Sequence, residues 1–257
     1  MSNLAWKNGQ LLTFESAGLD SNGWPPGTGI FETIKTVDGV PWALSRHMRR
    51  ALTSARRLNQ PFPAEELIRN AASIVIATNE FTSGRLRIHF SSLGDLIMTH
   101  QFYHPSSSPA NLMIRQSDRN STLLIDKRYP YTSNLELLDE ARAAGCEDFV
   151  FINQAGEVTE SAVSNLLFQI GSDWVTPPLC SGVLPGIMRG ILIEKAGVLV
   201  RKIRSRDLTD VRAGFLLSSL KIAQPIGRID EQILQISDES EQMRAVIAAT
   251  ALATSVG

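Results

Sequence analysis

The chain has few cysteines, no excess of charge of either sign and no long apolar run. Its two cysteines, Cys146 and Cys180, do not form a pair with metal-ligand spacing. Its 25 Lys and Arg residues nearly balance its 26 Asp and Glu residues, so no strong global field attracts nucleic acid or an anionic membrane. Any anion must therefore be captured by a local site.

Membrane and export signals are missing as well. The first ten residues are polar and contain no signal-peptide core, and no apolar run is long enough to span a bilayer. Together with the sparse cysteines, these features predict a cytoplasmic, reduced protein that has no membrane, nucleic-acid or metal partner.

What is present is an ordinary globular composition with one clear break. With 257 residues and 43% hydrophobic content, the chain can bury the core of one large domain or two small ones. The stretch HPSSSPAN at 104–111 combines two prolines with three serines, which is typical of a linker. We predict a small N-terminal domain over 1–103, an interdomain linker over 104–111 and a larger C-terminal domain over 112–257.

The first hundred residues contain hairpin and helix signals. An Asn-Gly pair at 8–9 and an Asp-Gly pair at 38–39 stand between apolar arms, which predicts two β-hairpins. Ser45 is a candidate N-cap for a helix through residue 58, and a second helix is predicted over 64–78. A later strand alternates apolar residues on one face, namely Leu86, Ile88 and Phe90. An antiparallel sheet with helices, an α+β unit, is expected.

The second half is predicted to mix strands and helices. Ser133 and Glu136 have capping-box spacing at the start of a helix over 134–144, and Gly145 can end it. Strands are expected near residues 112–115, 148–153, 165–170, 198–204 and 214–218. No internal repeat is found, so function must reside in individual sites.

One stretch raises a question about a carboxylate. GEVTESAVSNLLFQI, residues 156–170, has strand-like ends and a small, polar middle. The neighbours of Glu160 are too short to shield it; they are Ser161, Ala162, Ser164 and Asn165. Glu160 is therefore either a solvated loop residue or the partner of a cationic group.

Lys127 is the candidate nucleophile. It follows the apolar residues 123–125 and precedes Pro130, which discourages helix at Tyr129 and predicts a loop at a strand end. Binding and catalytic groups concentrate in such loops, where a partly desolvated lysine can lose its proton and attack a carbonyl. An ordinary exposed loop lysine is the alternative interpretation.

Two elements could bind an anion. Pro185 and Gly186 open a predicted helix whose first free N–H groups belong to Ile187 and Met188, and such a helix start is either a phosphate site or a plain N-terminus. The segment SRHMRRALTSARRL carries five arginines that cover more than one helical face, so most of them are expected in solvent. An arginine turned inward would need an anion. His47 in the same segment is expected to be a structural hydrogen-bonding residue.

Taken in order and spacing, these motifs resemble one family. GIFETIK, LSRHMRRALTSARRL, Lys127, EARAAGCEDFVFINQAGEVTESAVSNLLF and VLPGIMRG are together similar to the class-IV aminotransferases over about residues 28 to 230. That family comprises the pyridoxal-phosphate enzymes of fold type IV, among them branched-chain and D-amino-acid aminotransferases and 4-amino-4-deoxychorismate lyase. The resemblance implies a two-domain α+β fold like that of D-amino-acid aminotransferase.

The resemblance also implies roles for individual residues. Lys127 matches the Schiff-base lysine, and Glu160 matches the carboxylate that pairs with the pyridine nitrogen of pyridoxal 5'-phosphate, which makes the ring an electron sink. Tyr131, with Tyr129 as a competing candidate, matches the residue that contacts the ring hydroxyl. The phosphate is expected at Arg50, at the N–H groups of Ile187 and Met188, and at Ser219, with Ser218 as its alternative. The family further implies a homodimer whose active site is completed by a second subunit.

The reaction is less narrowly specified. SSLKIAQPI lacks the acidic residue that aminotransferases of the family often carry there, which together with the short chain favours the lyase. Ser91 to Asp95 lack the arginine usual in the lyase and D-amino-acid branches, and WPPGTG at 24–29 departs from the usual aromatic entrance. Arg87 aligns with the carboxylate-binding arginine of the branched-chain branch, although it can equally be an outward-facing strand residue.

Three interpretations of the function follow. The first is a lyase that removes pyruvate from aminodeoxychorismate to give 4-aminobenzoate. The second is a transaminase that uses a small branched-chain or D-amino acid and a 2-oxo acid acceptor. The third, disfavoured because Lys127 and Glu160 are both present, is a cofactor-free descendant without enzyme activity.

Overall fold

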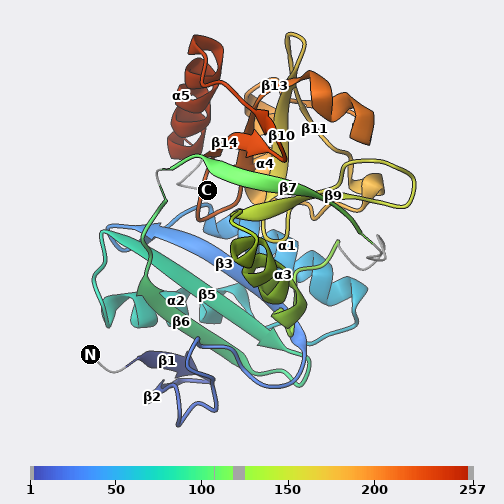
Figure 1. The fold of residues 1–257 in the computed structure, drawn as a ribbon. Coiled ribbons are helices and arrows are strands. Elements are labelled where there is room, and N and C mark those ends of the chain that lie inside the picture. The colour runs from blue at the N-terminus through green and yellow to red at the C-terminus, as the bar shows by residue number, and fades with distance from the viewer. Residues whose placement is uncertain (1–2, 107, 118–124, 254–257) are drawn as a thin grey trace. The chain divides into compact units, whose positions relative to one another are not determined.

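The computed structural model describes residues 3–106, 108–117 and 125–253, and these residues form two compact units (Figure 1). Of the described residues, the first unit contains 3–105 and 126–131, and the second contains 106, 108–117, 125 and 132–253. Both units combine helices with a sheet, which confirms the predicted α+β class. Among the described residues, no helix combines the length and the apolar character that crossing a membrane requires.

The first unit is built on an antiparallel sheet with the strand order β2-β1-β6-β5-β3-β4, and β8 pairs with β3. Its strands are β1 (Leu4–Lys7), β2 (Gln10–Thr13), β3 (Gly29–Val37), β4 (Val40–Pro41), β5 (Ser83–Ser91), β6 (Leu96–Phe102) and β8 (Arg128–Tyr129). The two predicted hairpins are confirmed. Asn8, Gly9, Asp38 and Gly39 all have positive φ, as two-residue type I′ loops require.

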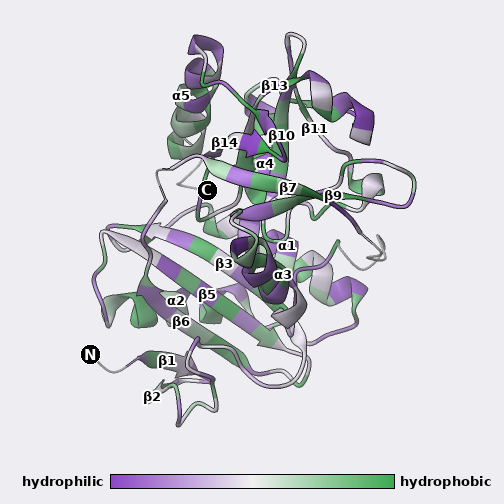
Figure 2. Cartoon of the chain, viewed as in Figure 1, coloured by the Kyte–Doolittle hydropathy of each residue, from purple (hydrophilic) through white to green (hydrophobic). Residues whose placement is uncertain are grey.

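Helices α1 (Leu44–Arg57) and α2 (Glu65–Ala77) pack on one face of this sheet. The face is formed by the predicted apolar positions of β5, which are fully or almost fully buried: Leu86, Ile88 and Phe90. Figure 2 shows hydrophobic and hydrophilic residues alternating along β3, β5 and β6. The opposite face of β5 therefore presents Arg87 and His89.

The predicted N-cap of α1 is wrong. The helix begins at Leu44, and its N-cap is Ala43, which has a left-handed backbone and no side-chain cap. Ser45 lies inside the first turn, where its hydroxyl accepts a hydrogen bond from Arg69 Nη2 at 2.8 Å. The side chain of Ser45 is used to join α1 and α2 rather than to cap α1.

The second unit contains a mixed sheet with the order β12-β11-β10-β13-β14-β7-β9, and β15 pairs with β14. Its strands are β7 (Ala110–Gln116), β9 (Asp148–Ile152), β10 (Asn165–Ile170), β11 (Asp173–Thr176), β12 (Leu199–Val200), β13 (Val211–Leu217), β14 (Gln224–Ile229) and β15 (Gln232–Ile233). Its helical segments are α3 (Thr132–Ala143), η2 (Leu179–Ser181), α4 (Ile187–Lys195), η3 (Ser205–Asp210) and α5 (Asp238–Ala253). A core of mostly aliphatic side chains fills this unit.

Two predicted boundaries in this unit are wrong. Helix α3 begins at Thr132, so Ser133 lies within its first turn and does not cap it. The strand predicted over 198–204 is reduced to the two residues of β12, because β12 pairs with β11 alone and the chain then turns to form a single bridge between Arg204 and Glu157.

Candidate active site

Lys127 lies at the edge of the first sheet, against two aromatic rings. It immediately precedes β8, and its carbonyl accepts a hydrogen bond from Phe31 N at 2.9 Å. Its Nζ lies 4.5 Å from the ring centroid of Phe31 and 4.8 Å from that of Tyr131. The amino group is thus held in partly desolvated surroundings, whereas most of the preceding apolar residues 123–125 fall outside the described residues.

The two candidate tyrosines lie in different places. The ring of Tyr131 lies against the Lys127 amino group. Tyr129 is 2% exposed and packs edge-on against His89, with a distance of 5.3 Å between ring centroids. Of the two, Tyr131 is the residue in contact with Lys127.

Trp24 joins the surroundings of Lys127 to Arg87. Its ring lies 4.9 Å from Phe31 and 6.0 Å from Tyr131, between centroids, and Arg87 Cζ lies 4.0 Å from the Trp24 centroid. Arg87 is 6% exposed, so the alternative of an outward, solvated strand residue is wrong. The ring of His89 is fully buried, and its two nitrogens have no partner in the described part of the chain. Burial, aided by the charge of Arg87, holds the pKa of His89 well below its usual value, so the ring is neutral.

Arg50 is held by a buried carboxylate that sequence analysis did not single out. Its Nε donates to Glu32 Oε1 at 2.8 Å and its Nη2 to Glu32 Oε2 at 2.5 Å. His47 Nδ1 lies 2.6 Å from the same Oε2. Burial lowers the pKa of His47, so the neutral ring donates its Nδ1–H to the ionised carboxylate. Because Glu32 directly follows Phe31 in β3, this triad fixes Arg50 close to the backbone that holds Lys127.

Glu32 should make the protein sensitive to acid. Although burial opposes ionisation, Arg50 and His47 together lower the pKa of Glu32 to about 2. A carboxyl whose pKa is depressed on folding stabilises the protein above pH 4.5 and loses that effect as the pH falls towards 2, here up to about 3 kcal/mol. Urea unfolding of Glu32→Gln is expected to show lower stability at pH 7, by about 3–5 kcal/mol because Arg50 loses its partner, and a shallower loss in acid.

The exposed Glu231 supplies the control for this prediction. Glu231→Gln should leave the acid dependence of the unfolding free energy as in the wild type. An unchanged acid dependence in Glu32→Gln would show that other carboxyls cause the effect.

Arg57 lies at the surface, as was expected for most of this segment, with its side chain 43% exposed, but it forms an ion pair. Its Nη1 lies 2.5 Å from Asp126 Oδ1, and Asp126 is 6% exposed. Since Asp126 immediately precedes Lys127, this ion pair fastens the chain next to the lysine from the far end of α1.

Glu160 is buried in the second unit and bonded to its surroundings. It is 9% exposed, and its Oε2 accepts hydrogen bonds from Asn165 Nδ2 at 3.0 Å and from Leu184 N at 2.9 Å. The alternative of a solvated loop residue is therefore wrong. Arg189 is 6% exposed and donates Nη2 to Pro177 O at 2.8 Å. Burial lowers the pKa of Arg189, and the charge of Glu160 opposes that shift, so a buried cation lies in the field of Glu160.

Asn165 brings the remaining candidates of this unit to one end of β10. Its Nδ2 also donates to Leu184 O at 3.0 Å, and a Cβ on Gly186 would come within 1.8 Å of its Oδ1. Gly186 is the N-cap of α4, which has no side-chain cap, so the N–H groups of Ile187 and Met188 start beside Asn165. Asn165 also faces Leu217 in the register of β10 and β13. The turn with Ser218 and Ser219 follows directly.

The small residues after Glu160 hold the turn that follows it by hydrogen bonds to a buried aspartate. Ser161 Oγ donates to Asp148 Oδ2 and Ala162 N to Asp148 Oδ1, both at 2.8 Å, and Ser164 N donates to Ser161 Oγ at 2.9 Å. Asp148 is fully buried, and burial raises its pKa. Its bonds hold the turn that places Glu160, a role that was not predicted from the sequence.

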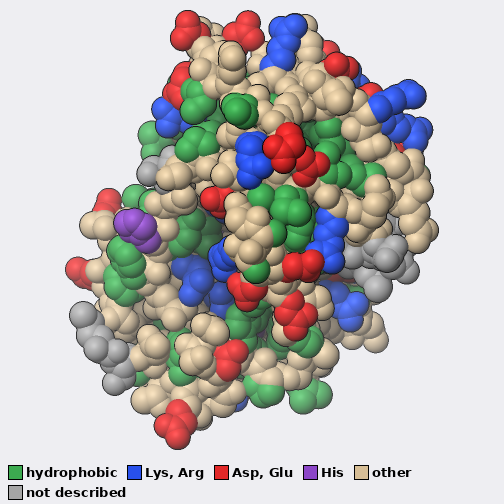
Figure 3. Space-filling view, viewed as in Figure 1, with side chains coloured by type: hydrophobic (Ala, Val, Ile, Leu, Met, Phe, Trp, Pro, Cys, Tyr) green, Lys and Arg blue, Asp and Glu red, His purple; other side chains and the backbone are tan. Residues whose placement is uncertain are grey.

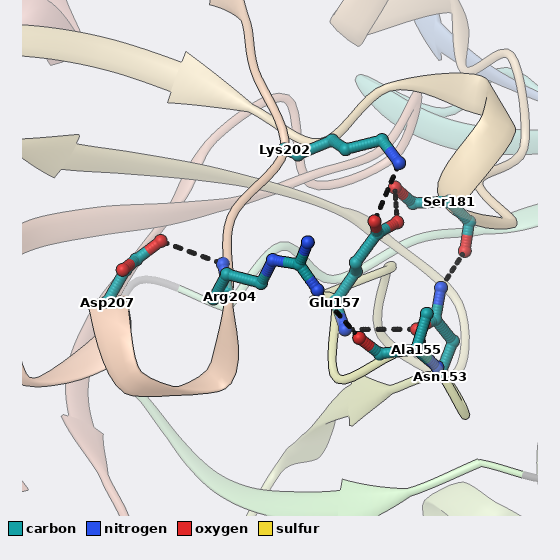
Figure 4. A network of polar contacts seen from close by, with 7 residues as sticks. All are labelled: Asn153, Ala155, Glu157, Ser181, Lys202, Arg204 and Asp207. Atoms are coloured by element: carbon teal, nitrogen blue, oxygen red, sulfur yellow. Dashed lines mark hydrogen bonds and ion pairs between the residues drawn. The ribbon is translucent and has the colours of Figure 1, made fainter.

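A second buried carboxylate anchors the chain on the other side of Glu160 (Figure 4). Glu157 accepts hydrogen bonds from Lys202 Nζ and from Ser181 Oγ, each at 2.7 Å. The hydrogen bonds from Lys202 and Ser181 lower the pKa of Glu157. Asn153 donates its Nδ2 to Ser181 O at 3.0 Å. Because Ser181 belongs to the segment that leads to Leu184, the network fixes the loop that donates to Glu160.

The profile of the amino-transferase class IV family matches residues 29–229. A relative from Mycobacterium tuberculosis, a bifunctional aminodeoxychorismate lyase and D-amino acid transaminase, is 25% identical over 241 residues, which cover 79% of this chain and 82% of that protein. The branched-chain-amino-acid aminotransferase of Escherichia coli is 26% identical over 235 residues and is covered to 76%, against 79% of this chain.

The fold is also found among solved structures. A hypothetical aminotransferase from Mycobacterium tuberculosis in its PLP-bound form superposes with a TM-score of 0.85, at 20% identity, over 97% of this chain and 99% of that chain. This likeness confirms the fold-type IV architecture that the sequence predicts.

Proposed function

The chain belongs to the class IV aminotransferase family of pyridoxal-phosphate enzymes, and we propose that it is a lyase that eliminates pyruvate from 4-amino-4-deoxychorismate to give 4-aminobenzoate. The proposal is carried by the segment SSLKIAQPI at 218–226, which lacks the acidic residue that aminotransferases of the family often have there, together with the contact chain from Lys127 through Phe31 and Trp24 to Arg87. The contact chain connects a partly desolvated amine, through two aromatic rings, with a buried guanidinium that forms no ion pair among the described residues. Such a pair suits a substrate that carries a carboxylate.

The residues present fit pyridoxal phosphate. The uncapped N-terminus of α4 offers the N–H groups of Ile187 and Met188 to a phosphate, and the close approach of Gly186 to Asn165 leaves no room for a side chain there. Glu160 is a buried carboxylate suited to a protonated ring nitrogen. When bound, the cofactor supplies an electron sink for the bonds at the substrate Cα.

We assign the protein groups as follows. Lys127 Nζ would hold the cofactor and, once released, would take the proton from the substrate Cα and pass it to the departing enolpyruvyl group, which leaves as pyruvate when its C–O bond breaks. Tyr131, which lies against Lys127, would orient the ring through its hydroxyl. Glu160 keeps a proton on the ring nitrogen. Arg50, the α4 N-terminus and Ser219 bind the phosphate, with Ser218 as the alternative to Ser219, and Arg87 binds a substrate carboxylate.

The runner-up is a transaminase for a branched-chain or D-amino acid. It is favoured by the position of Arg87 in β5, which matches the branched-chain branch, and by the second activity that the name of the Mycobacterium relative states. A transaminase must pass through a pyridoxamine form of the cofactor, whereas the lyase does not.

A direct experiment separates the two activities. The purified protein is incubated with aminodeoxychorismate, and 4-aminobenzoate and pyruvate are measured. In parallel it is incubated with amino acids, and pyridoxamine phosphate is measured. The lyase predicts equimolar 4-aminobenzoate and pyruvate and little pyridoxamine phosphate. Stoichiometric pyridoxamine phosphate from an amino acid, without the first reaction, would establish the transaminase instead.

Arg50 is expected to hold the cofactor phosphate. Its removal should weaken pyridoxal-phosphate affinity by roughly 1.5–3 kcal/mol, the range for a hydrogen bond to a charged group. Arg49 is the matched control because it is the adjacent, exposed residue of α1. Arg57, which also lies on this helix, is unsuitable because it pairs with Asp126 beside Lys127. Cofactor titration of Arg50→Ala and Arg49→Ala is the measurement.

The titration needs one further variant, because Glu32 loses its partner in Arg50→Ala. Arg50→Lys keeps a cation beside Glu32 but not the planar fork, so it should fold and still lose part of the affinity. Equal losses in Arg49→Ala and Arg50→Ala would mean that another arginine binds the phosphate.

A two-fold homodimer is the assembly we propose, since it is the commonest closed assembly and the one that the family resemblance implies. Sedimentation at low micromolar concentration is expected to give a single species of twice the chain mass that retains activity. An active monomer under these conditions would refute the dimer.

A further inference from the structure

One face of the first sheet carries three cations that have no acidic partner among the described residues. We call Lys35, Arg85 and Arg87 the cationic face. Lys35 lies directly opposite Arg85 in the register of β3 and β5, and Arg87 follows on the same face two residues later. Figure 3 shows Lys and Arg side chains gathered over this part of the molecule. These positions lie on the side of β5 away from the core packed by α1 and α2.

The two arginines are bonded to neutral oxygens. Arg87 Nη1 donates to Asn22 O at 3.0 Å, and Arg85 Nη2 donates to Gln101 Oε1 at 2.7 Å. The Nε atoms of Arg85 and Arg87 are buried and have no hydrogen-bond partner in the described ranges. A buried cation without a counter-charge is costly, and like charges directly opposite on neighbouring strands repel each other.

The ionisation of the face reflects this cost. Burial lowers the pKa of Lys35 and of Arg85, and burial together with the charge of Arg85 lowers the pKa of Arg87 to about 9. Two acidic groups oppose these shifts of pKa: Asp20 acts on Arg87, and Tyr103, whose own pKa is raised by burial, acts on Arg85. The two guanidinium groups are charged at neutral pH, and an anionic ligand would relieve the repulsion on this face.

The cationic face extends away from Lys127. His89 lies opposite Phe31, whose ring contacts the Lys127 amino group, and the pairs Arg87–Thr33 and Arg85–Lys35 follow in that order. Side chains two residues apart on a strand are separated by about 7 Å, which is about the distance between the carboxylates of a short dicarboxylate. A ligand that starts at Lys127 therefore meets Arg87 first and the Arg85–Lys35 pair next.

We propose that the Arg85–Lys35 pair binds a second carboxylate of the substrate, so that the substrate is a dicarboxylate. This inference rests on the proposed function and narrows it. The two products of the lyase, pyruvate and 4-aminobenzoate, each carry one carboxylate, so their parent carries two. A branched-chain amino acid carries one, so in a transaminase only a dicarboxylic 2-oxo acid acceptor would occupy the Arg85–Lys35 pair.

The test uses two unreactive probes of equal chain length. Glutarate has two carboxylates and valerate has one, and neither has an amine that could displace Lys127 from the cofactor. By calorimetry, the holoenzyme should bind glutarate about 10-fold or more tightly than valerate, the effect of one added charged hydrogen-bonding pair. Arg85→Met and Lys35→Met should each reduce this preference to about 2-fold or less without weakening the binding of valerate. Arg87→Met should weaken the binding of both probes.

Arg49→Met, on the exposed surface of α1, controls for net charge and should keep the preference. The melting temperature gives an independent readout: Arg85→Met should melt no lower than the wild type without ligand, because repulsion is removed, and glutarate should stabilise only the wild type. A glutarate preference that survives in Arg85→Met, or that is lost equally in Arg49→Met, overturns the inference. The result of this binding test is independent of the lyase assay, because neither probe is a substrate.

Discussion

Replacing Lys127 with alanine is expected to abolish the covalent link between protein and cofactor and to lower turnover by about 10²–10⁴-fold or more. The wild-type protein should purify yellow, with an absorbance band near the visible edge that borohydride bleaches and fixes to the chain. Lys127 Nζ is the amine held against Phe31 and Tyr131, where partial desolvation favours its nucleophilic form. Mass spectrometry after borohydride treatment should place the adduct on Lys127.

Lys195→Ala is the control for this result, because Lys195 is an exposed residue at the end of α4. It should retain the colour, the reducible link and the activity. A reducible link that persists in Lys127→Ala would exclude Lys127 as the attachment point and with it the motif assignment.

Local signals were sufficient for much of the fold. The hairpin loops at 8–9 and 38–39 need only residues that tolerate positive φ, and the alternation in β5 needs only its own pattern. Caps were predicted less well. Ser45 has the chemistry of an N-cap, but Ala43 already turns the chain in a left-handed conformation and starts the helix earlier. The start of α1 is set by the fold, because only Trp42 and Ala43 separate β4 from α1 and the chain must change direction within these two residues.

The candidate residues were found as members of ordered motifs, whereas the residues that hold them were missed. Glu32 binds Arg50 across 18 positions, Asp148 binds Ser161 across 13, and Arg189 lies in the field of Glu160. Each is a buried charge whose partner is distant in sequence, so no local pattern reveals the pair. A buried strand such as FET, with its one carboxylate, is the kind of signal that could have indicated Glu32.

Glu160→Gln is expected to lower turnover by about 10²-fold or more, the range observed when one group that stabilises developing charge is removed, while cofactor affinity changes much less. The carboxylate accepts hydrogen bonds from Asn165 Nδ2 and Leu184 N. The amide of glutamine has the same shape, and its oxygen can accept these hydrogen bonds when it occupies the position of Oε2. What the amide cannot do is keep a proton on the ring nitrogen, so the electron sink is weakened. Steady-state turnover and a cofactor titration measure the two effects separately.

Glu157→Gln is the matched control, because Glu157 is a buried carboxylate three positions earlier and is likewise held by hydrogen bonds, from Lys202 and Ser181. Its loss should lower the free energy of unfolding by about 1–3 kcal/mol and leave turnover per bound cofactor within a few-fold of the wild type. Equal losses of turnover in the two variants would mean that Glu160 acts by supporting the loop at 179–186. Normal turnover in Glu160→Gln would show that the ring nitrogen has a different partner. Either outcome would return Glu160 to a structural role, with Arg189 as its buried counter-charge.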